Sequence, residues 1–203
     1  MLTNNINFIN FKFNKKKSNV KRNLKLILKE KNQVILSLSK EYKNNFNKKL
    51  AKFFKKNLDY RIIGMGGSSL GAQAIYDFLK NKIKKKFIFV DNLQGTKKKN
   101  IKKIFNNLVI SKSGNTIETI VNSKVLINKG DKNLFITENK KSYLRHFANQ
   151  LKAEVIDHNN FIGGRYSVLS EVGMLPAELM GLNSKNFRQL NNIIKNKSFM
   201  NAL

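Results

Sequence analysis

The chain has 203 residues, which suits one large domain or one domain with extensions. It contains no cysteine, which excludes disulfides, thiolate nucleophiles and cysteine-based zinc sites, and its 41% of apolar residues exclude global disorder. Forty basic residues against twelve acidic ones give a net charge of +28, an excess that attracts polyanions.

The charge has two interpretations. Lys, Asn and Ile are abundant together, which is typical of an AT-rich genome, and selection for phosphate binding would not enrich uncharged Asn. No zinc-finger, RNP or basic-zipper pattern is present, so we expect no nucleic-acid partner. No apolar run approaches the roughly 20 residues of a membrane span, and the N-terminus lacks the apolar stretch of a secretory signal. We therefore expect a cytoplasmic protein without a membrane partner.

Residues 1–57 are predicted to form an N-terminal extension and amphipathic helices. Apolar residues such as Leu24 and Ile27 recur at helical spacing, with lysines between them. This pattern predicts one helix over Val20–Ser39 and another over Glu41–Lys56.

From Leu58 to Asp157, short apolar runs alternate with helical patterns. Continuous apolar runs are typical of strands that are buried on both faces. Strands are predicted over Tyr60–Ile63, Phe87–Val90, Leu108–Ile110, Leu134–Ile136 and Glu154–Ile156. Helices are predicted over Leu70–Lys80, Thr96–Phe105, Ile117–Asn128 and Ser142–Asn149. This alternation predicts an α/β fold, a three-layer α/β/α domain with a five-stranded parallel sheet.

We place this domain over residues 58–183. Residues 184–203 are expected to hold a C-terminal helix over Ser184–Lys195. In such sheets, ligands bind beyond the carboxyl ends of the strands. Three segments lie there: Gly64–Gly71, Ser111–Thr116 and the chain after Asp157.

The first segment, GMGGSSLGA, begins at Gly64 and joins a strand to a helix. Its glycines let backbone N–H groups approach an anion at the helix N-terminus. It is not a dinucleotide fingerprint, because Ser69 stands where the third glycine is needed, and it lacks the Lys-Ser/Thr of a Walker A loop. The turn suits a single phosphate or a sugar hydroxyl; a glycine turn that serves only packing is the alternative.

The second segment, SKSGNTIET, begins at Ser111. Ser111, Ser113 and Thr116 offer hydroxyls and Lys112 a positive charge at a helix N-terminus, which together predict a phosphomonoester cradle. A Ser/Thr helix cap with Glu118 as its capping glutamate is the alternative.

The third segment, FIGGRYSVLSEVGMLPAELMG, covers Phe161–Gly181. A Gly-Gly pair precedes Arg165, whose guanidinium suits an oxyanion, although a structural salt bridge or carbonyl clamp is the alternative. A helix is predicted over Ser170–Met180, and Pro176 is expected to kink or split it.

The strings GMGGSSLGA, ISKSGNTIET and GGRYSVLSEVG, in this order and spacing, resemble the N-terminal sugar-isomerase (SIS) domain of the phosphoglucose isomerase family. The similarity covers about Leu58–Leu182. Gly-Gly-Arg-Tyr-Ser is the string most specific to this family, whereas Ser-Lys-Ser-Gly is shared with other SIS domains.

The resemblance implies an isomerase that interconverts glucose 6-phosphate and fructose 6-phosphate through a cis-enediolate, in glycolysis and gluconeogenesis, without a metal or cofactor. It also implies a homodimer for the full-length family. The residues that match the family's site are Ser111, Lys112, Ser113 and Thr116 for the phosphate, Gly67, Ser68 and Gly164 for the rest of the substrate, and Arg165 for the enediolate charge.

The chain departs from the family pattern at several points. Asn115 replaces a Thr, and Glu171 replaces a small residue or proline and is expected to place a carboxylate near Arg165. The family's catalytic Glu, ring-opening His, C-terminal Lys and second SIS domain have no counterpart. Neither His146 nor His158 matches a catalytic position. We therefore expect an N-terminal portion or truncated gene product that binds sugar phosphate weakly and turns over poorly.

Two other functions stay open. One is a stand-alone SIS domain that senses sugar phosphates without chemistry, which would not need the Gly-Gly-Arg-Tyr-Ser string. The other is a basic nucleic-acid-associated protein, whose binding would be sequence-blind and steeply dependent on salt.

Overall fold

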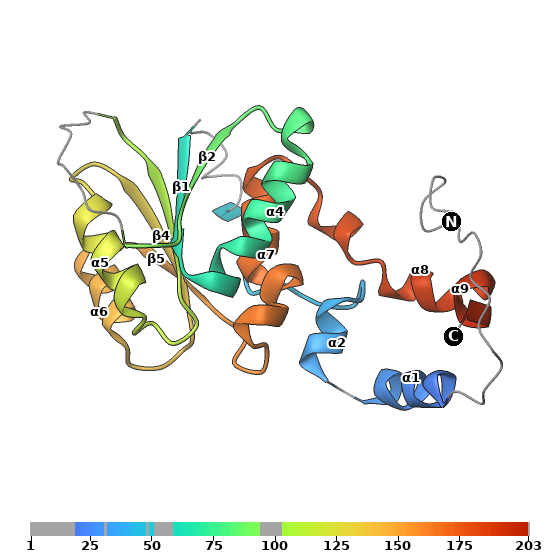
Figure 1. Cartoon of the computed structure of the whole chain (residues 1–203). Helices are drawn as coiled ribbons and strands as arrows, with labels where there is room; N and C mark the ends of the chain where they lie inside the picture. Colours follow the sequence, from blue (N-terminus) through green and yellow to red (C-terminus); the bar gives the residue numbers. More distant parts are fainter. Residues whose placement is uncertain (1–18, 31, 48, 51–58, 94–102, 203) are drawn as a thin grey trace. The chain divides into compact units, whose positions relative to one another are not determined.

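The computed structural model describes residues 19–30, 32–47, 49–50, 59–93 and 103–202 (Figure 1). The chain forms two compact units. We call residues 43–184 the sheet unit, and residues 1–42 with 185–203 the terminal unit. None of the helices in the described part of the chain is long and apolar enough to cross a membrane.

The sheet unit is built on a five-stranded sheet in which every neighbouring pair of strands is parallel. The strands are β1 (Asp59–Gly64), β2 (Lys86–Val90), β3 (Asn106–Ile110), β4 (Lys132–Thr137) and β5 (Glu154–Asp157), in the order β2-β1-β3-β4-β5. All five predicted strands are confirmed to within two residues at each end. The order of strands reverses between β1 and β3, because the chain first moves outward to β2 and then returns to the other side of β1.

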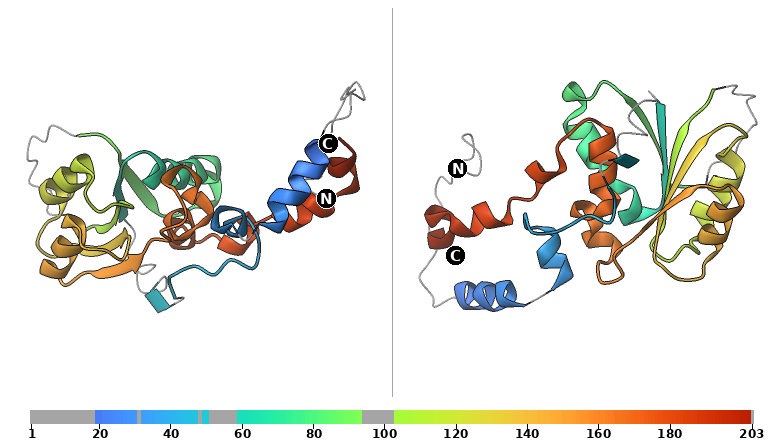
Figure 2. Two further views of the ribbon diagram at one scale, coloured as in Figure 1. Left: turned by 90° about the horizontal axis from the view of Figure 1, so that it is seen from below. Right: turned by 180° about the vertical axis from the view of Figure 1, so that it is seen from behind.

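Helices cover both faces of the sheet (Figures 1 and 2). One face carries α4 (Leu70–Phe78) and α7 (Glu171–Leu179), and the other carries α5 (Ile117–Leu126) and α6 (Tyr143–Gln150). The predicted three-layer α/β/α fold is therefore confirmed.

Alternate residues of the strands build a core on each side of the sheet. Ile63, Val109 and Phe135 are buried in one cluster with Leu144 and Ala148 of α6. On the opposite side, the ring of Tyr60 stacks on Phe87, with 4.8 Å between ring centroids, and Tyr76 of α4 packs against Phe87. The central strands β1, β3 and β4 are buried along most of their length, which explains why their apolar residues follow one another without alternation.

The prediction of one helix over Val20–Ser39 is wrong. The chain forms α1 (Val20–Lys29) and α2 (Gln33–Ser37), and the backbone of Glu30 is extended. The side chain of Asn32 accepts a hydrogen bond from Val34 N and so caps a new helix. The apolar spacing continues unbroken past this point, so it does not reveal that the Asn32 side chain caps a new helix here.

The helix predicted over Glu41–Lys56 is wrong in its first part. Residues 41–47 are not helical, and residues 49 and 50 are. Asn47 Oδ1 accepts from Leu50 N at 2.8 Å, which caps the chain at this later point. Residues 51–56 lie outside the described residues.

Most of the helix predicted over Thr96–Phe105 also lies outside the described residues, and its last residues, 103–105, are not helical. Phe105 N donates to Asp131 Oδ1 at 3.0 Å instead, which leads the chain into β3. The helix predicted over Ser184–Lys195 is a 3-10 turn, η4 (Ser184–Phe187), followed by α8 (Leu190–Lys195) and then α9 (Lys197–Ala202).

Pro176 does not split its helix, since α7 continues through it. Eight of the nine residues of α7 are buried. Packing therefore holds the helix together although Pro176 cannot donate a backbone hydrogen bond. The remaining short turns of the sheet unit are η1 (Gly66–Ser68), η2 (Lys80–Lys82) and η3 (Gly164–Leu169).

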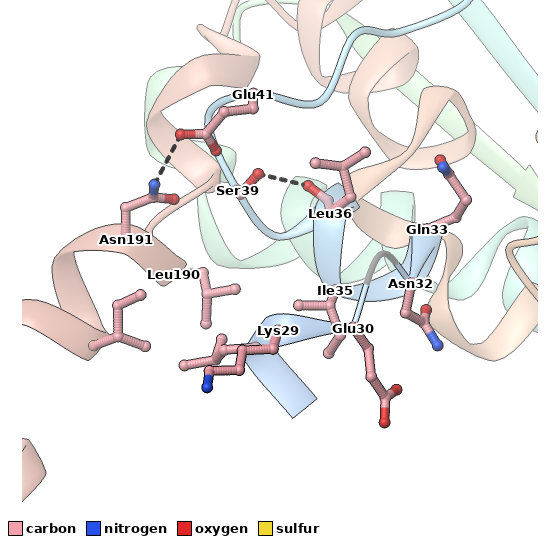
Figure 3. Close-up of a pocket in the computed structure, with 12 residues that line it drawn as sticks. Lys29, Glu30, Asn32, Gln33, Ile35, Leu36, Ser39, Glu41, Leu190 and Asn191 are labelled. Carbon is pink, nitrogen blue, oxygen red and sulfur yellow. Dashed lines mark hydrogen bonds between the residues drawn. The ribbon is translucent and has the colours of Figure 1, made fainter. Parts of the chain in front are cut away.

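The terminal unit joins the two ends of the chain. Arg188, which is only 3% exposed, donates to Ser37 O and Tyr42 O, and its guanidinium lies over the ring of Tyr42. Figure 3 shows a mainly apolar pocket of about 490 Å³ in this unit, between α1, α2 and α8. Asn191 donates to Glu41 at its rim, and none of the predicted site residues lines it.

Candidate functional site

The first two predicted loops lie where the strand order reverses. The segment Met65–Ser69 follows β1, and Ser111–Thr116 follows β3, the neighbour of β1. The strands come so close here that a Cβ on Gly64 would lie 2.8 Å from Ile110 O. In open α/β sheets, the crevice at such a reversal is the common ligand site.

The third loop packs directly against the first. A Cβ on Gly67 would lie 2.2 Å from Gly164 O and 3.0 Å from Arg165 N, so only glycine fits there. Ser167 Oγ donates to Gly164 O at 2.7 Å and lies 3.4 Å from Gly67 O, which ties η3 to η1. The backbone of the first loop therefore lies beside the Gly-Gly-Arg segment.

Two hydroxyl groups of the second loop, those of Ser111 and Thr116, contact each other. Ser111 Oγ lies 2.9 Å from Thr116 Oγ1 and accepts from Gly114 N at 3.2 Å. Thr116 precedes α5 but makes no capping hydrogen bond with its side chain. Ser113 Oγ accepts from Asn115 N at 3.2 Å. The helix-cap alternative is thus not what this loop adopts, and its hydroxyls form a cluster at the N-terminus of α5.

Lys112 connects the second loop to the third segment. Its Nζ donates to Asn160 O at 2.8 Å and lies 3.4 Å from Glu138 Oε1. Glu138, which follows β4, is buried and also pairs with Lys140. Burial by itself raises the pKa of Glu138, but the hydrogen bonds and charges of Lys140 and Lys112 outweigh it and hold the pKa below its ordinary value. Glu138 therefore stays ionised and keeps the Lys112 ammonium in place.

The side chains of Arg165 and Ser68 have no polar partner among the described residues. Arg165 is exposed, and its guanidinium makes no ion pair or hydrogen bond with any residue in the described ranges. Ser68 is half-buried, and its hydroxyl likewise has no hydrogen-bond partner within the described part of the chain. The salt-bridge alternative for Arg165 is therefore absent from this part of the chain.

The two histidines lie in different environments. His146 is exposed on α6, where Nε2 lies 3.0 Å from Gln150 Nε2. His158 is buried just after β5, with Nδ1 2.9 Å from Asn159 O and 3.9 Å from Glu171 Oε1. The contacts of Glu171 thus include Asn159 and His158, whereas we expected its carboxylate near Arg165.

The structure brings the three predicted loops together. Gly67 lies against Gly164 and Arg165, and Lys112 reaches Asn160 in the same segment. Sequence reasoning missed Glu138 and Asn160 as partners of Lys112. Glu138 could have been found, because it follows a predicted strand at the same edge of the sheet; the Asn160 contact is made by a backbone carbonyl and leaves no signal in the sequence.

The described residues contain no group of three or more His, Asp or Glu side chains that could hold a metal ion. The polar groups that the three loops carry are the hydroxyls of Ser111, Ser113 and Thr116, the ammonium of Lys112 and the guanidinium of Arg165, and Ser111 and Thr116 contact each other. Such a set is suited to a phosphate monoester beside a second developing negative charge.

Comparisons with known proteins identify a family for this chain. The family model described as phosphoglucose isomerase matches residues 45–201. Glucose-6-phosphate isomerase of Mycoplasma genitalium is 36% identical over 148 residues, which are 64% of this chain and 34% of that protein. The enzyme of the same name from Acholeplasma laidlawii is 36% identical over 149 residues, 63% of this chain and 35% of that protein. The chain spans about a third of the length of these relatives.

Solved structures share the fold. A hypothetical protein from Thermus thermophilus superposes with a TM-score of 0.65 at 21% identity, covering 90% of this chain and 48% of its own. Tagatose-6-phosphate ketose/aldose isomerase from Escherichia coli superposes with a TM-score of 0.54 at 17% identity, covering 71% of this chain and 44% of its own.

Proposed function

This chain belongs to the phosphoglucose isomerase family, and from this premise we propose that its three loops bind a hexose 6-phosphate for aldose–ketose isomerisation. The substrates would be glucose 6-phosphate and fructose 6-phosphate, which interconvert when a proton moves between C2 and C1 through a cis-enediolate. The names of the relatives support this substrate class.

In this proposal the second loop holds the phosphate. Ser111, Ser113 and Thr116 supply hydroxyl donors, and Lys112 supplies a positive charge that Glu138 and Asn160 already orient. The N-terminus of α5 adds unpaired backbone N–H groups and the positive end of the helix dipole. An anion that binds here requires little reorganisation of its partners, because the loop is set before the ligand arrives.

The first and third loops would hold the sugar. Gly67, Ser68 and Gly164 line its side of the site, and the guanidinium of Arg165 stabilises the negative charge of the enediolate. One oriented donor placed where charge develops contributes about 3 kcal/mol, judged from the loss of a single oxyanion-hole donor in other enzymes.

The observation that carries the proposal is the contact of the three loops. The approach of Gly67 to Gly164 and the reach of Lys112 to Asn160 support a common site for the phosphate and the enediolate of one hexose. In this proposal no residue of the three loops is the base that moves the proton between C1 and C2, and neither His146 nor His158 is given that role. The isolated chain should therefore bind sugar phosphates but convert them slowly or not at all.

Binding to glucose 6-phosphate tests the phosphate cradle. Lys112→Ala should weaken the affinity measured by calorimetry about 10- to 100-fold, because a hydrogen bond to a charged group contributes about 1.5–3 kcal/mol. Lys141→Ala, which removes an exposed lysine that no site loop uses, is the matched control and should bind as the unchanged chain does. Equal affinity for glucose and glucose 6-phosphate would refute the cradle.

Arg165→Ala separates an isomerase site from a sensor. In an isomerase site, this variant should lose most of its affinity for a hydroxamate analogue of the enediolate while retaining affinity for glucose 6-phosphate. If both ligands bind the variant and the unchanged chain equally, the site is that of a sugar-phosphate sensor.

A further inference from the structure

Next to the proposed phosphate site lies a buried pair that the proposed reaction does not use. Glu171 is fully buried at the start of α7, and His158, 3% exposed, follows β5. Glu171 Oε1 lies 3.9 Å from His158 Nδ1. Burying carboxylates and imidazoles is unfavourable unless they are paired, so this pair is expected to have a specific role.

The pair is linked to Lys112 by two consecutive residues. Glu171 Oε1 accepts from Asn159 N at 2.6 Å, and the next residue, Asn160, accepts from Lys112 Nζ at 2.8 Å. The short turn of Asn159 and Asn160 therefore donates a hydrogen bond to Glu171 of α7 and accepts one from Lys112. Removing the Glu171 carboxylate would take one hydrogen bond from the turn that presents an acceptor to Lys112.

The protonation site on His158 follows from its hydrogen bond. Nδ1 lies 2.9 Å from Asn159 O, and a carbonyl oxygen only accepts, so Nδ1 carries the hydrogen. Nε2 makes no hydrogen bond with a residue in the described ranges and is the atom left to take up a second proton. Protonation of His158 therefore means a positive charge beside Glu171.

Several influences act on that proton. Burial lowers the pKa of His158 most strongly, and the charge of Lys112 lowers it further, whereas the Asn159 carbonyl, Glu171 and Glu138 raise it; the pKa lies below the ordinary 6.5. His158 is thus mainly neutral at pH 7 without a ligand. A phosphate on Lys112 offsets the charge of that lysine and adds negative charge nearby, and both changes favour the protonated imidazole.

We propose that Glu171 and His158 position the Asn159–Asn160 turn against Lys112, and that His158 takes up a proton when a phosphate monoester binds there. The inference rests on the proposed function, because it needs the phosphate at Lys112. By linkage, a ligand that favours the protonated form must bind that form more tightly, so the protonation of His158 contributes tighter binding of a given ionic form of the phosphate as the pH falls.

The chain suits a direct test by NMR, because it contains two histidines. Their C2–H signals are followed across the histidine titration range with and without saturating glucose 6-phosphate, and His146→Gln assigns them. We expect the His158 midpoint to rise by about one pH unit with the ligand, which corresponds to about tenfold tighter binding by the protonated form. Glucose, which lacks the phosphate, should leave the His158 midpoint unchanged.

Glu171→Gln separates positioning from mere packing. Glutamine keeps an acceptor for Asn159 N but removes the charge, so the fold should persist while the His158 midpoint falls both with and without ligand. Glu171→Ala also removes the acceptor and should weaken glucose 6-phosphate binding beyond the effect of Glu171→Gln.

The outcomes distinguish the inference from the proposed function. If glucose 6-phosphate shifts the amide signals of Ser111, Lys112 and Ser113 but leaves the His158 midpoint unchanged, the inference is overturned and the proposed function stands. An unchanged His158 midpoint in Glu171→Gln also overturns it. If the ligand shifts none of those amide signals, the proposed function fails, and the inference fails with it.

Discussion

Lys112 shows how a single residue is prepared for its proposed ligand. Its ammonium faces a neutral carbonyl, Asn160 O, and a carboxylate, Glu138. Glu138 is shared with Lys140, so its charge does not act on Lys112 alone. The ammonium has three donors, and Asn160 O and Glu138 engage two of them, so a phosphate that reaches Lys112 accepts from the third while both partners stay in place.

Position 67 cannot accommodate any side chain, and glycine occupies it. Gly67→Ala should reduce the free energy of unfolding by about 1–3 kcal/mol, because the new Cβ would lie 2.2 Å from the backbone of Gly164. It should also weaken glucose 6-phosphate binding, since the first and third loops must separate. Chemical denaturation and calorimetry measure the two effects.

Gly164→Ala is the matched control for stability, because a Cβ at Gly164 would meet no atom within 4 Å. Its free energy of unfolding should stay within about 0.5 kcal/mol of that of the unchanged chain. Equal losses in Gly67→Ala and Gly164→Ala would show that the contact between the loops does not stabilise the fold.

At the scale of elements, α5, α6 and α7 differ in whether a side chain caps the first turn of the helix. Ser142 accepts from Arg145 N at the start of α6, and Ser170 accepts from Val172 N at the start of α7, so both are ordinary caps. Thr116 occupies the same position before α5, but its hydroxyl pairs with Ser111. Of these three helices, the one without a side-chain cap is α5, whose N-terminus is proposed to bind the phosphate.

The packing of η3 on α7 and α4 predicts how much two Gly→Ala substitutions lower the free energy of unfolding relative to one another. In a helix interior, Gly→Ala normally stabilises by about 1 kcal/mol. A Cβ on Gly173 of α7 would lie 2.1 Å from the backbone oxygen of Val168, a clash that outweighs this gain. Gly173→Ala should therefore lower the free energy of unfolding, as measured by chemical denaturation.

Gly71→Ala in α4 provides the comparison. Its Cβ would lie 2.7 Å from Val168 Cγ2 and 2.9 Å from Val168 Cβ, which is a clash with a side chain at longer distances than the 2.1 Å to backbone at Gly173. Gly71→Ala should reduce stability less than Gly173→Ala, and the reverse order would contradict the described packing of η3.

At the scale of the whole molecule, the two ends of the chain meet in one unit. Arg188 donates to two backbone carbonyls, of Ser37 and Tyr42, that lie about 150 positions earlier in the chain. Leu190 N donates to Leu38 O in the same region. These contacts join segments that flank the sheet unit in sequence, so the terminal unit depends on both.

Arg188→Ala should loosen the terminal unit, because it leaves buried carbonyls without their donor, which destabilises by about 1–3 kcal/mol each. Hydrogen exchange at the backbone amides of Leu36–Tyr42 should become faster, while the amides of β1 and β3 keep their protection. Arg22→Ala, at an exposed position of α1, is the control and should leave both regions unchanged. Faster exchange throughout the sheet would show that Arg188 supports the whole chain instead.

The strands were predictable because each one contains a short run of mostly apolar residues, and the central strands β1, β3 and β4 are buried along most of their length. The bounds of the N-terminal helices were harder to predict. The side chains of Asn32 and Asn47 each accept one backbone hydrogen bond and so start a helix within a segment of continuous apolar spacing. Apolar spacing does not report such caps, so helices extrapolated from spacing ran too far.

The sequence by itself determined the parallel α/β sheet and the three segments at its carboxyl edge, since burial periodicity and glycine-rich turns are local properties. It could not determine which groups meet across those segments. The contact of Gly67 with Gly164, the partners of Lys112 and the pairing of His158 with Glu171 join residues up to about 100 positions apart. Only tertiary structure decides these, because strand order and helix packing set the distances between loops.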